Sequence, residues 1–160
     1  MTDAPAPVAS AGMLIRRPVA EVFEAFVDPA VTSRFWFTRG SGRLEPGARV
    51  RWDWEMYGVG TDVRVKAIEW GRRILIDWDT ADDPTEVEWL FEALGADTFV
   101  TVVNRGFPDS PAGVARALDS TGGFNLVMAA AKIWLEHGID PRIVEDAHAT
   151  HRVADWTGRR

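Results

Sequence analysis

One short segment of the sequence has the spacing of a metal site. Residues 145–151, EDAHATH, place His148 and His151 three residues apart, with Glu145 three residues before His148. On a helix these side chains would share a face, and two imidazoles with a carboxylate can hold zinc. The spacing is common by chance, however, and no residue that would orient the ligands can be identified. A solvated helix face is the favoured interpretation, so neither a metal nor a cofactor is predicted.

A second candidate is a polar residue in an apolar strand pattern. Alternation along residues 98–105 puts Asn104 on the same face as Val100 and Val102. An amide there could orient a carbonyl or a hydroxyl group of a ligand, but it cannot take a proton at neutral pH. A β-bulge would shift the alternation by one residue and put Arg105 in its place.

The remaining groups do not form a catalytic arrangement. Asp53, Asp77 and Asp79 fall on the charged face of their strands, where a solvated role is expected. We find no Ser–His–acid arrangement and no glycine-rich phosphate loop. The absence of cysteine excludes a disulfide, a thiolate zinc site and a cysteine nucleophile. No catalytic residue is therefore predicted, and the question of enzymatic activity stays open, with a non-enzyme favoured.

The composition is that of a globular chain with unusual aromatic content. The 160 residues include eight Trp and eight Phe but one Tyr, which suggests a bulky core or a wide apolar cavity. The net charge of −6 argues against a nucleic-acid binder. The start of the chain does not read as a secretory signal, and no run approaches the roughly 18 apolar residues of a membrane span. We expect a cytoplasmic monomer or small oligomer, with a homodimer as one alternative.

The elements that would position these groups begin with a long helix at residues 120–138. It is apolar nearly all the way round, except for a stripe formed by Asn125, Ala129, Lys132 and Glu136. Such a helix must be covered on most sides. Gly138 is expected to end it, and a separate short helix is predicted for 111–119, beginning at Ser110 and Pro111.

Alternating apolar and polar residues predict five consecutive strands that form an antiparallel meander. A further strand is predicted at 12–17, followed by one short helix from Pro18 and a second at 28–37. The sheet is expected to curve around the long helix, burying three of its sides and leaving its polar stripe wet. The predicted strands of the meander are 48–56, 61–70, 73–79, 86–92 and 98–105.

The domain organisation that follows is simple. Residues 1–11 are predicted to be a flexible lead-in, and residues 12–138 a single α+β domain. Residues 139–160 are predicted to be a polar tail that is partly helical.

In the order and spacing of these elements the chain resembles the START-like (SRPBCC) superfamily, which has the helix-grip fold. Within that superfamily it is similar to the group related to the C-terminal domain of the activator of Hsp90 ATPase. The matching segments are 16–36, 45–54, 97–107 and 122–138. Two positions depart from the family pattern. Gly123-Phe124 stands where the family usually has Gly-Trp, and Asn104 stands where a carboxylate is frequent, which removes an obvious general base.

The resemblance implies several functions. Relatives bind lipids, hormones or polyketides in a cavity between sheet and helix, some cyclise or dehydrate aromatic polyketides, and the eukaryotic activator binds a chaperone. Our hypothesis is non-covalent binding of a small, largely hydrophobic ligand, aromatic or lipid-like. A cyclase or dehydratase that uses the same cavity, and a chaperone-linked interaction protein with Trp156 as an anchor, are the alternatives.

The candidate binding residues are the apolar side chains expected between the sheet and the long helix, with Asn104 as a polar contact. The alternative is that the tryptophans meet and pack solid. Phe35 and Phe37 are expected to close the mouth of the cavity. The predicted walls are Trp52, Trp54, Met56, Trp78, Trp89 and Phe91 from the sheet, and Phe124, Val127, Met128, Ala131 and Leu135 from the helix.

Overall fold

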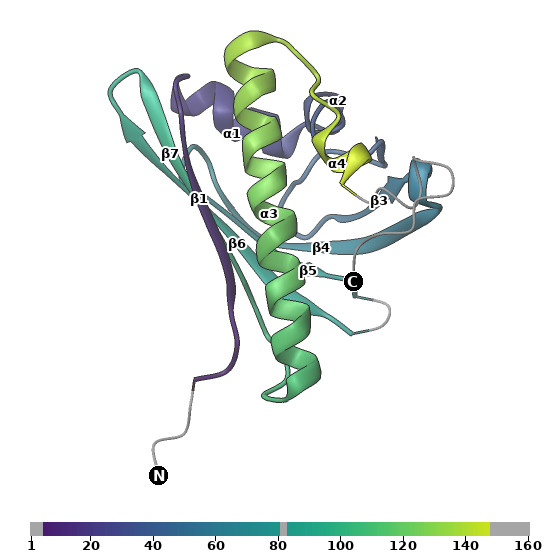
Figure 1. Cartoon of the computed structure of the whole chain (residues 1–160). Coiled ribbons are helices and arrows are strands. Elements are labelled where there is room, and N and C mark those ends of the chain that lie inside the picture. Colours follow the sequence, from purple (N-terminus) through teal and green to yellow (C-terminus); the bar gives the residue numbers. More distant parts are fainter. Residues whose placement is uncertain (1–4, 81–82, 148–160) are drawn as a thin grey trace.

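A seven-stranded antiparallel sheet and one long helix make up most of the fold (Figure 1). The computed structural model describes residues 5–80 and 83–147. The strands lie in the order β1-β7-β6-β5-β4-β3-β2. Their bounds are β1 Ala9–Ile15, β2 Arg39–Gly40, β3 Arg49–Trp54, β4 Val59–Glu69, β5 Arg73–Trp78, β6 Thr85–Leu94 and β7 Asp97–Arg105. The helices are α1 Val19–Val27, α2 Pro29–Thr32, α3 Pro111–His137 and α4 Ile143–Asp146, with a 3-10 turn η1 at Glu55–Tyr57.

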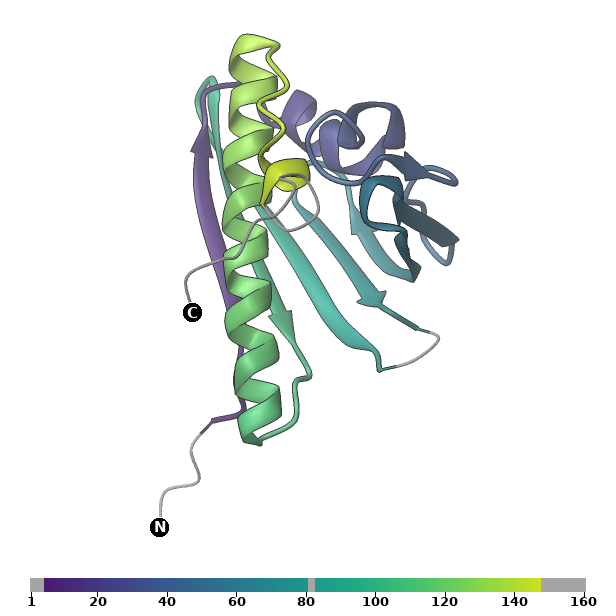
Figure 2. The same cartoon turned by 45° about the vertical axis from the view of Figure 1, so that its right-hand side comes forward.

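The sheet curves around α3, as the sequence predicted. Helix α3 runs along β1 and β7, and the sheet bends away from it toward β3 (Figure 2). The two short helices α1 and α2 lie beside one end of α3, where they cover the apolar face of the sheet (Figure 1). The predicted α+β helix-grip class is confirmed.

Helix α3 is one continuous helix of 27 residues, so the separate helix predicted at 111–119 is wrong. The Ser110 side chain accepts a hydrogen bond from the Gly113 N–H at 3.1 Å, and Pro111 occupies the first turn. Gly138 ends the helix in the left-handed region, at φ 66°. Gly122 remains helical, because nothing in the sequence around it forces the bend that its conformational freedom would permit.

The polar stripe of α3 is only partly exposed to solvent, which corrects the prediction that the whole stripe is solvated. Lys132 donates a hydrogen bond to the carbonyl of Leu14 at 2.8 Å, and it forms an ion pair with Glu136 at 2.6 Å. Glu136 in turn accepts from the backbone N–H of Arg16 at 3.0 Å. Backbone groups at the end of a strand need partners once a helix covers them. The stripe supplies those partners for β1, and only its Asn125 end is exposed.

The short elements differ from the prediction mainly at their ends. The first strand begins at Ala9 rather than residue 12, because its register with β7 runs from Ala9 opposite Asn104 to Ile15 opposite Thr98. The helix predicted at 28–37 begins as expected, with the Asp28 carboxylate accepting from the Ala30 N–H at 3.0 Å, but it ends at Thr32. The predicted meander is confirmed as β3 to β7.

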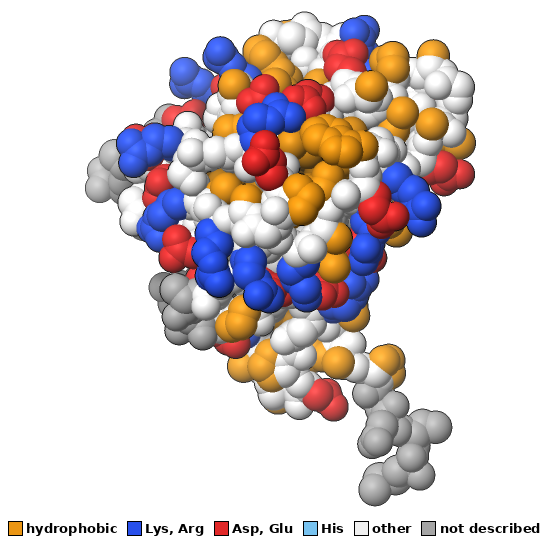
Figure 3. Space-filling model, turned by 180° about the vertical axis from the view of Figure 1, so that it is seen from behind, with side chains coloured by type: hydrophobic (Ala, Val, Ile, Leu, Met, Phe, Trp, Pro, Cys, Tyr) orange, Lys and Arg blue, Asp and Glu red, His pale blue; other side chains and the backbone are white. Residues whose placement is uncertain are grey.

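The inward face of the sheet carries the apolar residues of the alternating pattern, and the outward face is charged. From behind, Lys and Arg side chains are interleaved with Asp and Glu, next to smaller apolar areas (Figure 3). Neighbouring strands therefore meet through ion pairs on this face. The buried inward side chains are Val50, Trp52, Trp54, Val63, Val65, Ile74, Ile76, Val87, Trp89, Phe91, Val100 and Val102.

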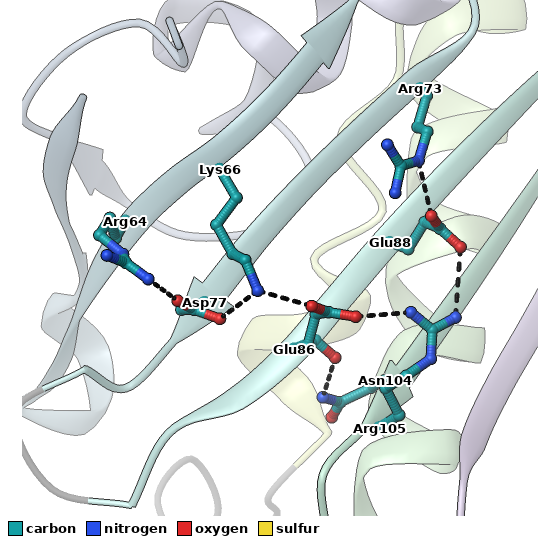
Figure 4. Close-up of polar contacts among 8 residues, drawn as sticks. All are labelled: Arg64, Lys66, Arg73, Asp77, Glu86, Glu88, Asn104 and Arg105. Atoms are coloured by element: carbon teal, nitrogen blue, oxygen red, sulfur yellow. Dashed lines mark hydrogen bonds and ion pairs between the residues drawn. The ribbon is translucent and has the colours of Figure 1, made fainter. Parts of the chain in front are cut away.

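A ladder of ion pairs crosses the outer face from β4 to β7 (Figure 4). Glu86 accepts hydrogen bonds from Lys66 and from Arg105, both at 2.7 Å. The hydrogen bond from Lys66, followed by that from Arg105, lowers the pKa of Glu86. For Glu88, burial raises the pKa, but hydrogen bonds from Arg73 and Arg105 outweigh it and leave the pKa lowered. These carboxylates hold the strands together in their ionised form.

Candidate functional site

A cavity of about 460 Å³ lies between the sheet, α3 and α4. Its inner wall is made of side chains that are themselves less than a tenth exposed, including Trp36, Phe124 and Val127. The volume is within the range of small-molecule sites, roughly 300 to 1,000 Å³. The lining residues are Trp36, Trp54, Tyr57, Val59, Trp78, Asp79, Asp83, Thr85, Asn104, Phe107, Arg116, Asp119, Ser120, Gly123, Phe124, Leu126, Val127, Val144 and Ala147.

Four aromatic rings in mutual contact form the apolar wall. Trp54 and Trp78 are stacked, with ring centroids 6.2 Å apart and an interplanar angle of 12°. Trp36 lies 5.4 Å from Trp78, and Phe124 lies 5.9 Å from Trp36 and 5.6 Å from Trp78. Because each ring is held by at least two others, the wall is fixed without a ligand.

Helix α3 contributes a second wall through its spacing. Ser120, Gly123 and Val127 recur at intervals of three and four residues, so they share one face of the helix. A Cβ atom at Gly123 would meet no other atom within 4 Å. Gly123 is exposed and borders the cavity, so a larger side chain at this position has room to extend over it.

The polar end of the cavity is organised by Asn104. Its side chain is 5% exposed, and its amide nitrogen donates to the Thr85 hydroxyl and to the carbonyl of Glu86, both at 2.9 Å. Its amide oxygen accepts from the Ser120 hydroxyl at 2.8 Å. The network joins β6, β7 and α3, and it places two hydroxyl groups on the cavity wall.

The rim of the cavity carries charge. Arg116 forms an ion pair with Asp83 and lies over the ring of Phe107, with its guanidinium carbon 5.4 Å from the ring centroid. Asp79 and Asp119 also lie on the rim. Among the described residues, the rim therefore carries three carboxylates and one guanidinium, and that guanidinium forms an ion pair.

Segment α4 closes one side of the cavity. The Tyr57 hydroxyl lies within hydrogen-bond distance of the carbonyl oxygens of Val144 and Glu145, at 2.5 and 2.7 Å. Val144 and Ala147 then line the cavity. The part of the predicted tail that the structure describes is thus attached to the sheet and belongs to the site.

The structure brings some of the predicted binding residues together and separates others. Those that line the cavity are Trp54, Trp78, Asn104, Phe124 and Val127. The others pack in or against the solid hydrophobic core. The inward-facing aromatic residues are therefore shared between that core and the cavity wall. Those outside the cavity are Phe35, Phe37, Trp52, Met56, Trp89, Phe91, Met128, Ala131 and Leu135.

The expectation that Phe35 and Phe37 close the mouth is corrected by the packing. Phe37 stacks on Trp52 with centroids 4.9 Å apart, and Phe35 contacts Phe26 at 5.4 Å. Both rings are less than a tenth exposed. Of the three consecutive aromatic residues 35–37, it is Trp36 that reaches the cavity. Together with Met56, Phe35 and Phe37 line only a separate pocket of about 110 Å³.

Several lining residues were missed by sequence reasoning. Trp36 lies in an irregular segment after α2, where no periodicity assigns a direction to its side chain. Thr85 is in phase with the inward-facing Val87 and Trp89, but the predicted strand begins one residue after it, at 86. No pattern distinguishes Ser120 from a surface residue. Tyr57 could have been predicted as a lining residue. It is the single tyrosine of the chain, and it directly follows the predicted strand 48–56, which carries the candidates Trp52 and Trp54.

The residues of the candidate metal site lie mostly outside the ranges that the structure describes. His148 and His151 fall beyond Ala147, as does Trp156, and only Glu145 of the proposed ligands is described. Among residues 5–80 and 83–147 no three potential ligands are clustered for a metal ion. No helix in the same ranges is long and apolar enough to cross a membrane.

Comparison with known proteins identifies the family. Residues 16–128 match the family described as Activator of Hsp90 ATPase homolog 1-like protein. The chain belongs to this family. The match covers β2 to β7, the short helices α1 and α2, and the first two thirds of α3. No curated protein matches the sequence.

Solved structures share the fold of this family member. Protein SSP2350 from Staphylococcus saprophyticus is 28% identical, with a TM-score of 0.74, over 84% of this chain and 96% of its own. DynU16, from the dynemicin biosynthetic locus, is 23% identical, with a TM-score of 0.75, over 85% of this chain and 49% of its own. The di-domain ARO/CYC BexL, from the BE-7585A biosynthetic pathway, is 20% identical, with a TM-score of 0.68, over 81% and 46%. The last two likenesses establish the fold alone.

Proposed function

We propose that the cavity binds a small, largely apolar ligand without covalent chemistry. The observation that carries the proposal is the cavity itself. About 460 Å³ of space is bounded by four aromatic rings that are already in contact with one another. Apolar surface that stays lined by rings and is not filled by side chains favours an apolar guest. Two fused aromatic rings, or an acyl chain of similar bulk, fit in this volume and leave part of it open.

The aromatic wall favours a flat ligand over a flexible one. Trp54 and Trp78 present parallel faces, and a planar ring can stack on such a surface or meet its edge. Phe124 stands nearly perpendicular to Trp78, at 87°. A flat guest can therefore lie along one ring and contact the edge of another.

A cyclase-type reaction in the same cavity is the rival function. BexL is named as an ARO/CYC protein, and DynU16 comes from a biosynthetic locus. Binding and turnover are separated by recovering the ligand after incubation. Simple binding returns it unchanged, whereas a cyclase returns an isomer of equal mass and a dehydratase a product that has lost water, both separated from the ligand by chromatography with mass spectrometry. A chaperone-linked role needs no occupied cavity and is tested by capture of a chaperone from the source cell.

The test of binding uses naphthalene as a plain apolar probe, measured by calorimetric titration. Gly123→Leu places a side chain beside the cavity and is expected to weaken binding at least about tenfold through lost space. Gly122→Leu is the matched control, since its Cβ also has open space but does not border the cavity. Equal affinities in wild type and both variants would contradict the proposal, as would a wild type that binds no naphthalene.

A further inference from the structure

The orientation of the Asn104 amide is fixed by its neighbours. The carbonyl of Glu86 can only accept a hydrogen bond, so the atom 2.9 Å from it must be the amide nitrogen. The second N–H then points to the Thr85 hydroxyl oxygen, also at 2.9 Å. The amide oxygen is left to accept the proton of Ser120. All the donors of this side chain are therefore used inside the protein, and Asn104 has none to offer a ligand.

The fixed orientation of the Asn104 amide decides whether the hydroxyl groups of Thr85 and Ser120 can donate to a ligand or accept from it. Thr85 accepts from Asn104, so its own O–H hydrogen is free to donate into the cavity, where its side chain is 8% exposed. Ser120 has given its only hydrogen to Asn104, so it can only accept. One buried donor and one half-buried acceptor thus bond to the same amide group, and both line the cavity.

We propose that this pair recognises a hydroxyl group on the apolar ligand. A hydroxyl accepts from Thr85 and donates to Ser120 at the same time, and so satisfies both positions. An ether or a ketone satisfies only Thr85, and a bare hydrocarbon neither. The inference rests on the proposed function, since it concerns the polar end of the same cavity. The ligand class it names is a hydroxylated aromatic molecule, such as a phenol or a naphthol.

The charges of the rim act against a carboxylic acid. Asp119 directly precedes Ser120 on α3, and Asp79 also borders the cavity. The guanidinium of Arg116 is engaged by Asp83 and by the ring of Phe107. An anionic headgroup would meet one donor, an oxygen that only accepts, and several carboxylates. Fatty acids and aromatic acids are therefore disfavoured against neutral hydroxyl compounds.

The experiment compares four probes of one ring system: naphthalene, 2-naphthol, 2-methoxynaphthalene and 2-naphthoate. Wild type is expected to bind 2-naphthol about tenfold more tightly than naphthalene, with 2-methoxynaphthalene between them and 2-naphthoate weakest. Thr85→Val and Ser120→Ala should each lower the ratio of 2-naphthol affinity to naphthalene affinity from about tenfold to about twofold or less. The matched control is Thr61→Val, a buried threonine that does not border the cavity, which should leave every affinity unchanged.

The outcomes separate this inference from the function on which it rests. Equal binding of naphthalene and 2-naphthol overturns the hydroxyl site while leaving an apolar binding cavity. A preference for 2-naphthol that survives both Thr85→Val and Ser120→Ala also overturns it. Tightest binding of 2-naphthoate overturns the argument from the rim charges. If no probe binds up to its solubility limit, the proposed function fails together with the hydroxyl site.

Discussion

The Ser120 hydroxyl of α3 donates a hydrogen bond of 2.8 Å to the Asn104 side chain of β7. This single contact fastens the long helix to the sheet at the polar end of the cavity. The same amide also holds Thr85 and the backbone of Glu86 on β6. Asn104 therefore connects β6, β7 and α3 and positions the two hydroxyl groups, while its own donors stay bonded within the protein.

The first prediction concerns the stability that Asn104 provides. Asn104→Ala leaves one buried and two half-buried polar groups without their partner, and it is expected to lower the free energy of unfolding by about 2–4 kcal/mol. Urea denaturation measures the change. Asn125→Ala is the control, because that amide is exposed and, among the described residues, bonds only to the carbonyl of Thr121 in its own helix. A cost for Asn104→Ala no larger than for Asn125→Ala would contradict this role.

Replacing threonine by valine should change the free energy of unfolding in opposite directions at two buried positions, 61 and 98. The Thr61 hydroxyl has no hydrogen-bond partner among the described residues, so Thr61→Val should raise the free energy of unfolding by about 1 kcal/mol. The Thr98 hydroxyl donates to the carbonyl of Arg17 at 2.9 Å, so Thr98→Val should lower it by about 1–2 kcal/mol. Chemical denaturation of both variants tests the pair. Changes of the same sign would show that hydrogen bonding does not decide the difference.

The glycines of α3 give a third prediction. Gly122 is helical and a Cβ there meets nothing within 4 Å, so Gly122→Ala should stabilise the protein by up to about 1 kcal/mol. Gly138→Ala should destabilise it by about 1 kcal/mol, because φ is 66° at that position. Thermal unfolding of the two variants is the measurement. A loss of stability in Gly122→Ala would contradict a straight, continuous helix.

The outer ion-pair ladder makes stability depend on pH. The pKa values of Glu86 and Glu88 are lowered in the folded state below the ordinary value of 4.5. A lowered carboxyl pKa contributes stability that is present above the unfolded pKa and is lost as the pH falls through the folded pKa. The free energy of unfolding should therefore decrease as the pH falls below about 4.5.

A variant isolates this contribution. Glu86→Gln should lower stability at pH 7 and flatten part of its decrease toward pH 3. Glu92→Gln is the control, since the Glu92 carboxylate is exposed and forms no ion pair within the described chain. Urea denaturation at several pH values provides the curves. A Glu86→Gln curve parallel to that of wild type would exclude the ladder as a source of the acid dependence.

The sequence predicted the fold well because the fold depends on periodicity. Val50, Trp52 and Trp54 alternate with charged residues, and this pattern alone determines which face of β3 is buried. The two ends of α3 could also be predicted, because Ser110 caps its first turn and Gly138 ends it in the left-handed conformation. The polar stripe of α3 was misread, since periodicity cannot show that Lys132 reaches the carbonyl of Leu14, 118 residues away.

The site was harder to predict than the fold. Alternation directed Trp52, Trp54 and Trp89 inward alike, but whether an inward ring borders a cavity depends on what packs against it. Trp52 is covered by Phe37, whereas Trp54 is left open beside Trp78. The hydroxyl pair was beyond reach because Thr85 and Ser120 meet only through the tertiary fold.

The most direct test of the cavity is to titrate the protein with 2-naphthol and follow the indole N–H signals by NMR, assigned with Trp→Phe variants. The account predicts saturable shifts at Trp36, Trp54 and Trp78, which line the cavity. It also predicts an unchanged signal for Trp70, which follows β4 at the other end of the sheet and contacts Phe23. Shifts at Trp70 with none at the three cavity tryptophans, or no saturable shift at all, would contradict it.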